Sequence, residues 1–142
     1  MTDTNGELLV WRPEFNLGIE EIDLQHRYFL SLINRLHRAM QSGDDHATQV
    51  ALLRELNAYV KFHFISEENM MRFANYDQLT EHQRHHYELI DQLNAKESGL
   101  AVRYNEQQAH AVVEFLVRWF TIHTTGEDKA FADFLRRQQQ VC

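Results

Sequence analysis

The stretch HFISEENMMRFANYDQLTEHQRHH, residues 63–86, decides the fold, because it contains the end of one helical pattern and the start of the next. Positions three and four residues apart form a core-facing stripe in each half: His63, Glu67, Met70, Leu79, His82 and His86. This spacing is typical of amphipathic helices packed against a core. Only the short break ANYD separates the two patterns, so we expect two neighbouring antiparallel helices.

The same spacing recurs on both sides of this stretch and predicts four helices in all. Their approximate ranges are 19–41, 46–73, 77–97 and 105–136. Short connections favour an all-α fold, an up-down-up-down antiparallel four-helix bundle. Residues 1–18 precede it as an extended N-terminal arm, whose Trp11 and Phe15 are expected to cover an open end of the core. We therefore expect residues 1–142 to form a single domain.

Composition restricts the class of protein. Hydrophobic residues make up 44% and charged residues 25% of the chain, which is typical of a globular domain. The formal charge of -7 argues against nucleic acid or an anionic membrane as a partner. No stretch approaches the roughly 20 apolar residues that span a bilayer, and the start lacks a signal-peptide pattern, so we expect a cytoplasmic protein. Cys142 is the only cysteine, which excludes an intrachain disulfide and a thiolate metal site.

The motif HQRHH, residues 82–86, separates into two kinds of histidine. His82 and His86 share the apolar stripe and, at i and i+4, can reach one metal ion from one helix face. His85 falls in a polar row and is expected to be solvated, with contacts to Glu81 and Glu88. Two core histidines that are hydrogen-bonded to neighbours are the alternative reading of the inward pair.

The second helix repeats this spacing with His63 and Glu67, in a stripe otherwise made of leucine and valine. A carboxylate in such a stripe is costly to bury unless it is paired or binds a cation. A buried hydrogen-bonded pair of these two residues is the alternative. Glu68 lies off the stripe and is expected on the surface.

The first and fourth helices each place a histidine, His26 and His123, in their stripes. Asp128 follows five residues after His123, a spacing wider than one regular helix face allows. Gly126 between them would permit a local distortion. Periodicity alone leaves the direction of Asp128 open.

The helix directions bring these residues to one level. At about 1.5 Å per residue, all of them lie roughly 8–20 Å from the same end of the bundle. Independent structural histidines would have no reason to share that level. The predicted metal-binding set is His26, His63, Glu67, His82, His86, His123 and Asp128.

Five imidazoles and two carboxylates are too many donors for one ion and suit two ions bridged by the carboxylates. Iron, zinc, copper and manganese all accept such donors. Zinc is usually satisfied by four ligands, and the zinc-protease pattern HExxH is absent because Gln83 stands where its glutamate would be. The ExxH motif of ferritin-like di-iron proteins is also absent.

The chain resembles the bacterial members of the hemerythrin family. Four motifs carry the resemblance, in the family's order: WRPEFNLGIEEIDLQH, HFISEENMM, HQRHH and WFTIHTTGED. The resemblance implies reversible O2 binding at a non-haem di-iron site with carboxylate and oxo or hydroxo bridges. It implies that one iron takes His82, His86 and His123, that the other takes His26 and His63 with an open position, and that Glu67 and Asp128 bridge them.

This resemblance favours an O2-binding protein over an enzyme. Two alternatives remain: a di-iron redox enzyme that consumes peroxide or nitric oxide, and a sensory fragment that passes its O2 or redox state to a signalling domain or partner protein. The choice between carrier, storage and sensor roles, the O2 affinity and the oligomeric state stay open.

Overall fold

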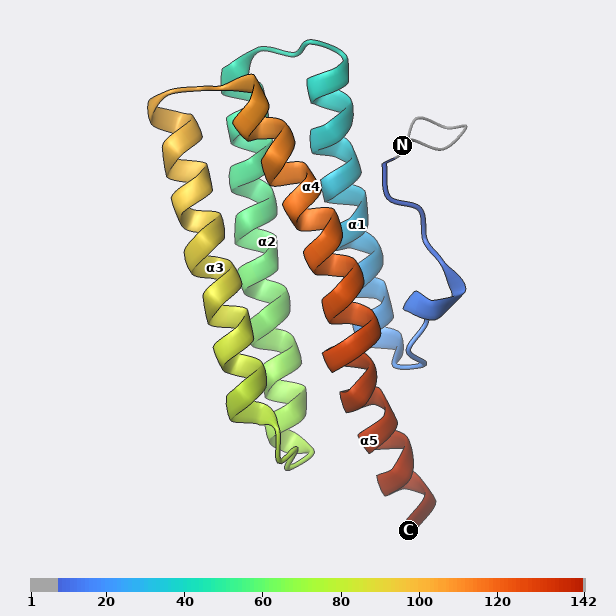
Figure 1. Ribbon diagram of the computed structural model, residues 1–142. Helices are drawn as coiled ribbons and strands as arrows, with labels where there is room; N and C mark the ends of the chain where they lie inside the picture. Colours follow the sequence, from blue (N-terminus) through green and yellow to red (C-terminus); the bar gives the residue numbers. More distant parts are fainter. Residues whose placement is uncertain (1–7, 142) are drawn as a thin grey trace.

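The computed structural model describes residues 8–141, which form an up-down-up-down antiparallel four-helix bundle with a further helix at its lower end (Figure 1). The fold prediction is confirmed. The helices are α1 (Glu20–Gln41), α2 (His46–Phe73), α3 (Leu79–Val102), α4 (Glu106–His123) and α5 (Lys129–Val141). A short 3-10 turn, η1 (Pro13–Phe15), precedes them, and a π-helical turn, η2 (Thr124–Asp128), joins α4 to α5. Residues 1–7 of the expected arm and Cys142 lie outside the described residues.

Two helix ends differ from expectation. α3 continues to Val102 instead of ending near residue 97, because Leu100 is buried in the core and its packing outweighs the weak helix propensity of Gly99. The expected fourth helix, 105–136, is interrupted by η2. Within residues 8–141, no helix is both long and apolar enough to cross a membrane.

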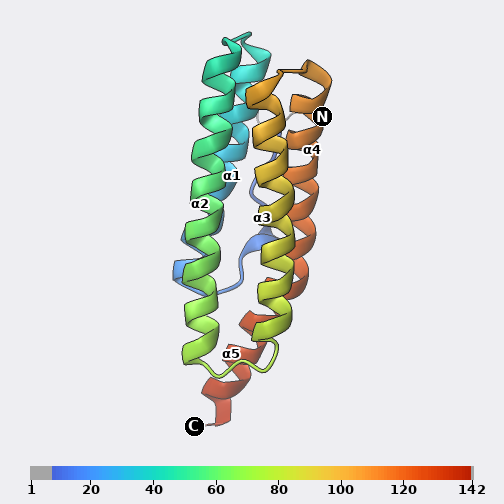
Figure 2. The same cartoon turned by 90° about the vertical axis from the view of Figure 1, so that its left-hand side faces the viewer.

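Short connections fix the antiparallel order of the helices. Asp45 caps the start of α2 by accepting a hydrogen bond of 2.7 Å from the Thr48 backbone N–H. Asn105 caps α4 in the same way through the Gln108 N–H. Seen from the side, the four helices run nearly parallel to one axis, which brings the start of α1 and α3 beside the end of α2 and α4 (Figure 2).

Two apolar clusters fill the bundle and leave a polar layer between them. The larger cluster includes Phe29, Phe64, Leu89 and Phe120 and continues toward the α1–α2 and α3–α4 connections. The smaller cluster lies near α5 and consists of Leu17, Ile22, Met71, Phe131 and Ala132. Five buried histidines and two buried carboxylates fall at the level between these clusters, whereas the buried His37 lies eleven residues beyond His26 along α1.

Residues 8–18 of the N-terminal arm pack along the side of the bundle, beside α1 and α4, rather than over an open end (Figure 1). Phe15 is fully buried and meets the Phe120 ring edge-on at 5.2 Å. Asn34 of α1 holds the arm, because its side chain accepts hydrogen bonds from the backbone N–H groups of Leu8 and Leu9 and donates one to the Leu9 carbonyl. The arm therefore closes the seam between α1 and α4 above the polar layer.

Replacement of Asn34 by alanine should release this arm. The three lost hydrogen bonds leave buried backbone groups of Leu9 unpaired, so the free energy of unfolding should fall by about 1–3 kcal/mol. Urea denaturation checks the value. Ser31→Ala is the control, since its hydroxyl bonds only the Tyr28 carbonyl of its own helix and should change stability by less than about 0.5 kcal/mol. Equal stability of both variants would contradict the role given to Asn34.

Candidate metal centre

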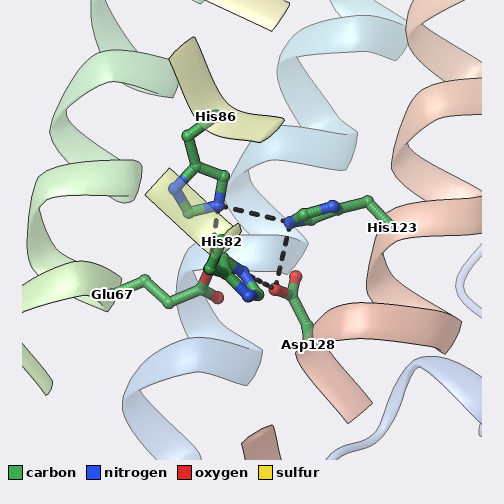
Figure 3. A group of neighbouring side chains, drawn as sticks. All are labelled: Glu67, His82, His86, His123 and Asp128. Carbon is green, nitrogen blue, oxygen red and sulfur yellow. Dashed lines mark hydrogen bonds and ion pairs between the residues drawn. The ribbon is translucent and has the colours of Figure 1, made fainter. Parts of the chain in front are cut away.

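The seven residues predicted as metal ligands converge in the polar layer of the bundle. Each is at most 5% exposed. They come from every helix of the bundle and from η2, and Figure 3 shows five of them directed toward a common centre. The residues brought together are His26, His63, Glu67, His82, His86, His123 and Asp128.

Glu67 directs one carboxylate oxygen toward each half of the cluster. Its Oε1 lies 3.0 Å from His82 Nε2 and 3.2 Å from His86 Nε2. Its Oε2 faces the Nε2 atoms of His26 and His63 at 3.9 and 3.8 Å. One carboxylate thus lies between two groups of imidazoles.

Asp128 divides its oxygens in the same way. Its Oδ1 lies 3.0 Å from His82 Nε2 and 3.3 Å from His123 Nε2, while its Oδ2 lies 3.1 Å from His26 Nε2. The donor atoms therefore form two sets that share both carboxylates. One set is Glu67, His82, His86, His123 and Asp128, and the other is His26, His63, Glu67 and Asp128.

The spacing of these donors fits metal ions. Ligands at about 2.0–2.2 Å from an ion are about 3 Å apart when they are neighbours in its coordination shell. His86 Nε2 and His123 Nε2 face each other at 3.2 Å, a separation that neighbouring ligands of one ion can have. Glu67 Oε2 is buried with no hydrogen-bond partner among the described residues. A buried oxygen without a donor is costly, and a cation in this position would satisfy it.

The π-helical turn explains how Asp128 reaches the cluster. Lys129 N–H bonds to the Thr124 carbonyl five residues earlier, so this turn is wider than an α-helical turn and brings residues five apart onto one face. Periodicity based on regular α-helix could not predict this direction. Gly126 has an ordinary helical backbone, and a Cβ added there would meet no atom within 4 Å. The distortion therefore does not depend on the glycine.

Protons on two histidines balance the charge of the carboxylates. Burial lowers the pKa of His82, but hydrogen bonds to Asp128 and Glu67 outweigh burial and raise it to about 9. Burial also opposes the charged form of His123, yet the charge and hydrogen bond of Asp128 raise its pKa to about 10. For His63, burial is the largest effect and lowers the pKa to about 4. Burial raises the pKa of Asp128, but the charge of His123 and hydrogen bonds from nearby imidazoles hold it well below its usual value.

Aromatic side chains surround the cluster: Phe29, Phe64, Trp119 and Phe120 each contact one of its histidines. Phe64 stacks on His86 with ring centroids 3.7 Å apart, and Trp119 stacks on His123 at 4.2 Å. Phe120 meets His26 edge-on, and Phe29 meets His63. These contacts separate the cluster from bulk water on several sides.

Two further carboxylates contact the outer nitrogens of clustered histidines, and sequence reasoning missed both. Glu68 Oε2 lies 2.8 Å from His86 Nδ1, and Gln83 Nε2 donates a hydrogen bond of 3.3 Å to Glu68 Oε1. Glu127 Oε1 lies 3.2 Å from His123 Nδ1. The prediction that Glu68 is a surface residue is wrong, because its carboxylate reaches across to α3 and its side chain is only 20% exposed.

His85 lies outside the clustered donors and is partly exposed, as predicted, but it also makes a contact that the sequence did not predict. Its Nδ1 lies 2.5 Å from Glu127 Oε2, and its side chain is 32% exposed. The expected contact to Glu81 is present at 3.5 Å. The helical periodicity of α3 could not predict the contact with Glu127, because that carboxylate comes from η2, which follows α4.

In the α1–α2 half of the cluster, no carboxylate of the described residues contacts the outer nitrogens of His26 and His63. His63 Nδ1 lies 2.6 Å from Gln25 Oε1, whose Nε2 donates to Ser66 Oγ at 3.0 Å. His26 Nδ1 is buried with no hydrogen-bond partner among the described residues. Gln25 precedes His26 in sequence and was not among the predicted site residues.

Comparisons with known proteins assign a family. The sequence profile of the Hemerythrin HHE cation binding domain matches residues 17–135. The chain is 34% identical over 126 residues to a bacteriohemerythrin of Stenotrophomonas maltophilia, covering 89% of this chain and 80% of that protein. It is 32% identical over 128 residues to a bacteriohemerythrin of Pseudomonas aeruginosa, covering 90% and 82%. A crystal structure of a hemerythrin mutant shares the fold with a TM-score of 0.76 and 24% identity, covering 89% of this chain and 96% of that one.

Metal binding should release protons. His82 and His123 have pKa values above 7 and are protonated at neutral pH, so a cation that takes their Nε2 atoms must displace those protons. Affinity for Zn²⁺, used as a redox-inert probe of chelator-treated protein, should therefore increase as pH rises from 6 to 8. Calorimetry in buffers of different ionisation enthalpy measures the proton release. Heats that are independent of the buffer, with an affinity that does not change with pH, would contradict the charge assignment.

Proposed function

The chain belongs to the hemerythrin family, and from this premise we propose that it binds O2 reversibly at a non-haem di-iron centre. His82, His86 and His123 would hold one iron, and His26 and His63 would hold the other. Glu67 and Asp128 would bridge the two, together with a hydroxide-type oxygen. When bound, the two ferrous ions supply the electrons that O2 takes up on binding and returns on release.

The division of the two carboxylates between the imidazole groups is the observation that supports this proposal. Glu67 and Asp128 each direct one oxygen to the α3–α4 histidines and the other toward the α1–α2 histidines. A single ion would not use donors arranged as two sets with shared members. Two bridged ions account for all seven residues.

The donor set favours binding over substrate oxidation. Five neutral imidazoles supply less negative charge than a carboxylate-rich site, so they stabilise high-valent iron less well. The two carboxylates and one hydroxide offset most of the charge of two ferrous ions, which leaves a small positive charge to bury. The α1–α2 half supplies two imidazoles rather than three, and Glu67 Oε2 on that side has no hydrogen-bond partner among the described residues, so this half would be the one that accepts O2.

The aromatic lining would protect the bound gas from water. Phe29, Phe64 and Phe120 are each at most 3% exposed and contact histidines of the cluster. A dry apolar wall slows the entry of water and protons, which promote irreversible oxidation of ferrous iron. These side chains contribute exclusion of water rather than chemistry.

An anaerobic-to-aerobic absorbance titration with iron quantification tests the function. Protein reduced under argon should be nearly colourless, should hold two irons per chain, should become coloured in air and should bleach again when O2 is removed. His63→Ala should lose the coloured form, because it removes one of the two imidazoles of the α1–α2 position. His110→Ala is the control, since this exposed histidine of α4 pairs with Glu106 and is not among the clustered donors.

Two results would overturn the proposal. One is stoichiometric zinc without any O2-dependent spectrum. The other is catalytic consumption of peroxide or nitric oxide at a rate that exceeds O2 release, which would make the site that of a redox enzyme.

A further inference from the structure

The proposed ligand set leaves three residues of the motif HQRHH unused, and two of them, Gln83 and His85, contact carboxylates. Each contacts a carboxylate whose second oxygen contacts a proposed ligand. The two chains of contacts are Gln83–Glu68–His86 and His85–Glu127–His123. Both lead to histidines of the α3–α4 iron position.

The α1–α2 position lacks such charges. Behind His63 stands the neutral amide of Gln25, 2.6 Å away, and behind His26 no described residue accepts a hydrogen bond. The two proposed iron positions thus differ in the residues behind their ligands as well as in the number of imidazoles. Among the described residues, a carboxylate contacts the outer nitrogen of a proposed ligand at the α3–α4 position and not at the α1–α2 position.

We propose that Glu68 and Glu127 are positioning residues that make the α3–α4 iron more easily oxidised than the α1–α2 iron. This inference rests on the proposed di-iron function. A carboxylate that accepts the outer N–H of an imidazole raises the donor strength of the inner nitrogen. Such a charge-assisted hydrogen bond is roughly twice as strong as one to a neutral amide. Stronger donors stabilise the ferric state, so the first electron should leave the α3–α4 iron.

His85 has a specific part in this arrangement. The Glu127 side chain is 36% exposed and, with His85 and His123, lines a surface cleft of about 490 Å³. Water in the cleft competes for that carboxylate. Arg84 Nη2 lies 3.1 Å from His85 Nε2, which makes Nε2 the acceptor and leaves the Nδ1 proton for Glu127. We infer that this bond keeps Glu127 against His123.

A spectroelectrochemical titration of the iron-loaded protein tests the proposal. Each step removes one electron from a ferrous ion and passes it to the electrode, so the wild type should show two separated one-electron steps. Glu127→Gln and Glu68→Gln should raise the potential of the first step and narrow the separation between the two potentials. The reason is that a neutral amide replaces a charged carboxylate as the acceptor of the imidazole N–H. Gln25→Glu should also narrow the separation, by lowering the potential of the second step.

Controls separate positioning from a structural role. Glu88→Gln removes one charge from the same cleft, where the described residues give Glu88 an ion pair with Arg84 and no contact with a proposed ligand, and should leave both steps unchanged. His85→Ala should raise the potential of the first step, as Glu127→Gln does. The double variant should show the same potential as Glu127→Gln alone. Glu127→Ala should weaken iron binding about 10- to 100-fold in a chelator competition. A purely structural residue would lower the unfolding temperature without moving either potential.

The outcomes distinguish this inference from the proposed function. A wild type without two irons refutes the di-iron function itself. A wild type that holds two irons and binds O2, with steps that do not move in Glu127→Gln, Glu68→Gln and Gln25→Glu, refutes only the positioning role. If a glutamine variant fails to fold, Gln25→Glu decides, because it adds a charge without removing a contact of the α3–α4 position.

Discussion

The burial of two carboxylates at one level of an apolar bundle is the constraint on which the rest of the structure depends. Glu67 and Asp128 are almost completely buried, and an isolated carboxylate in such a place would cost several kcal/mol. Five imidazoles surround them and supply protons or, as we propose, share metal ions with them. Since these partners come from all four helices, the cluster ties the helices together in a defined register.

That register follows from direction and connection length. Short turns reverse the chain after α1, α2 and α3, so the starts of two helices lie beside the ends of the other two. Apolar clusters above and below hold the layer, and the arm closes one seam through Phe15 and Asn34. The fold therefore creates a dry polar layer, and the residues of that layer determine what it binds.

Much of this could be predicted from the sequence, because helical periodicity reports which side chains face the core. It selected the five clustered histidines and Glu67 from single-helix stripes. It left Asp128 open, since a π-helical turn breaks the rule on which periodicity depends, and the family motif supplied that residue. Periodicity also missed Glu68, Glu127 and Gln25. These side chains lie at the boundary of the core, where periodicity does not decide whether a residue points inward or outward. The i, i+4 spacing of His123 and Glu127 was an available signal.

Anomalous diffraction from crystals of the iron-loaded protein, collected at the iron absorption edge, tests the central claim most directly. The account predicts two iron peaks in the polar layer, one among His82, His86 and His123 and one beside His26 and His63, each within bonding distance of Glu67 and Asp128. A single peak, or peaks bound to only one of these carboxylates, would contradict a bridged di-iron centre.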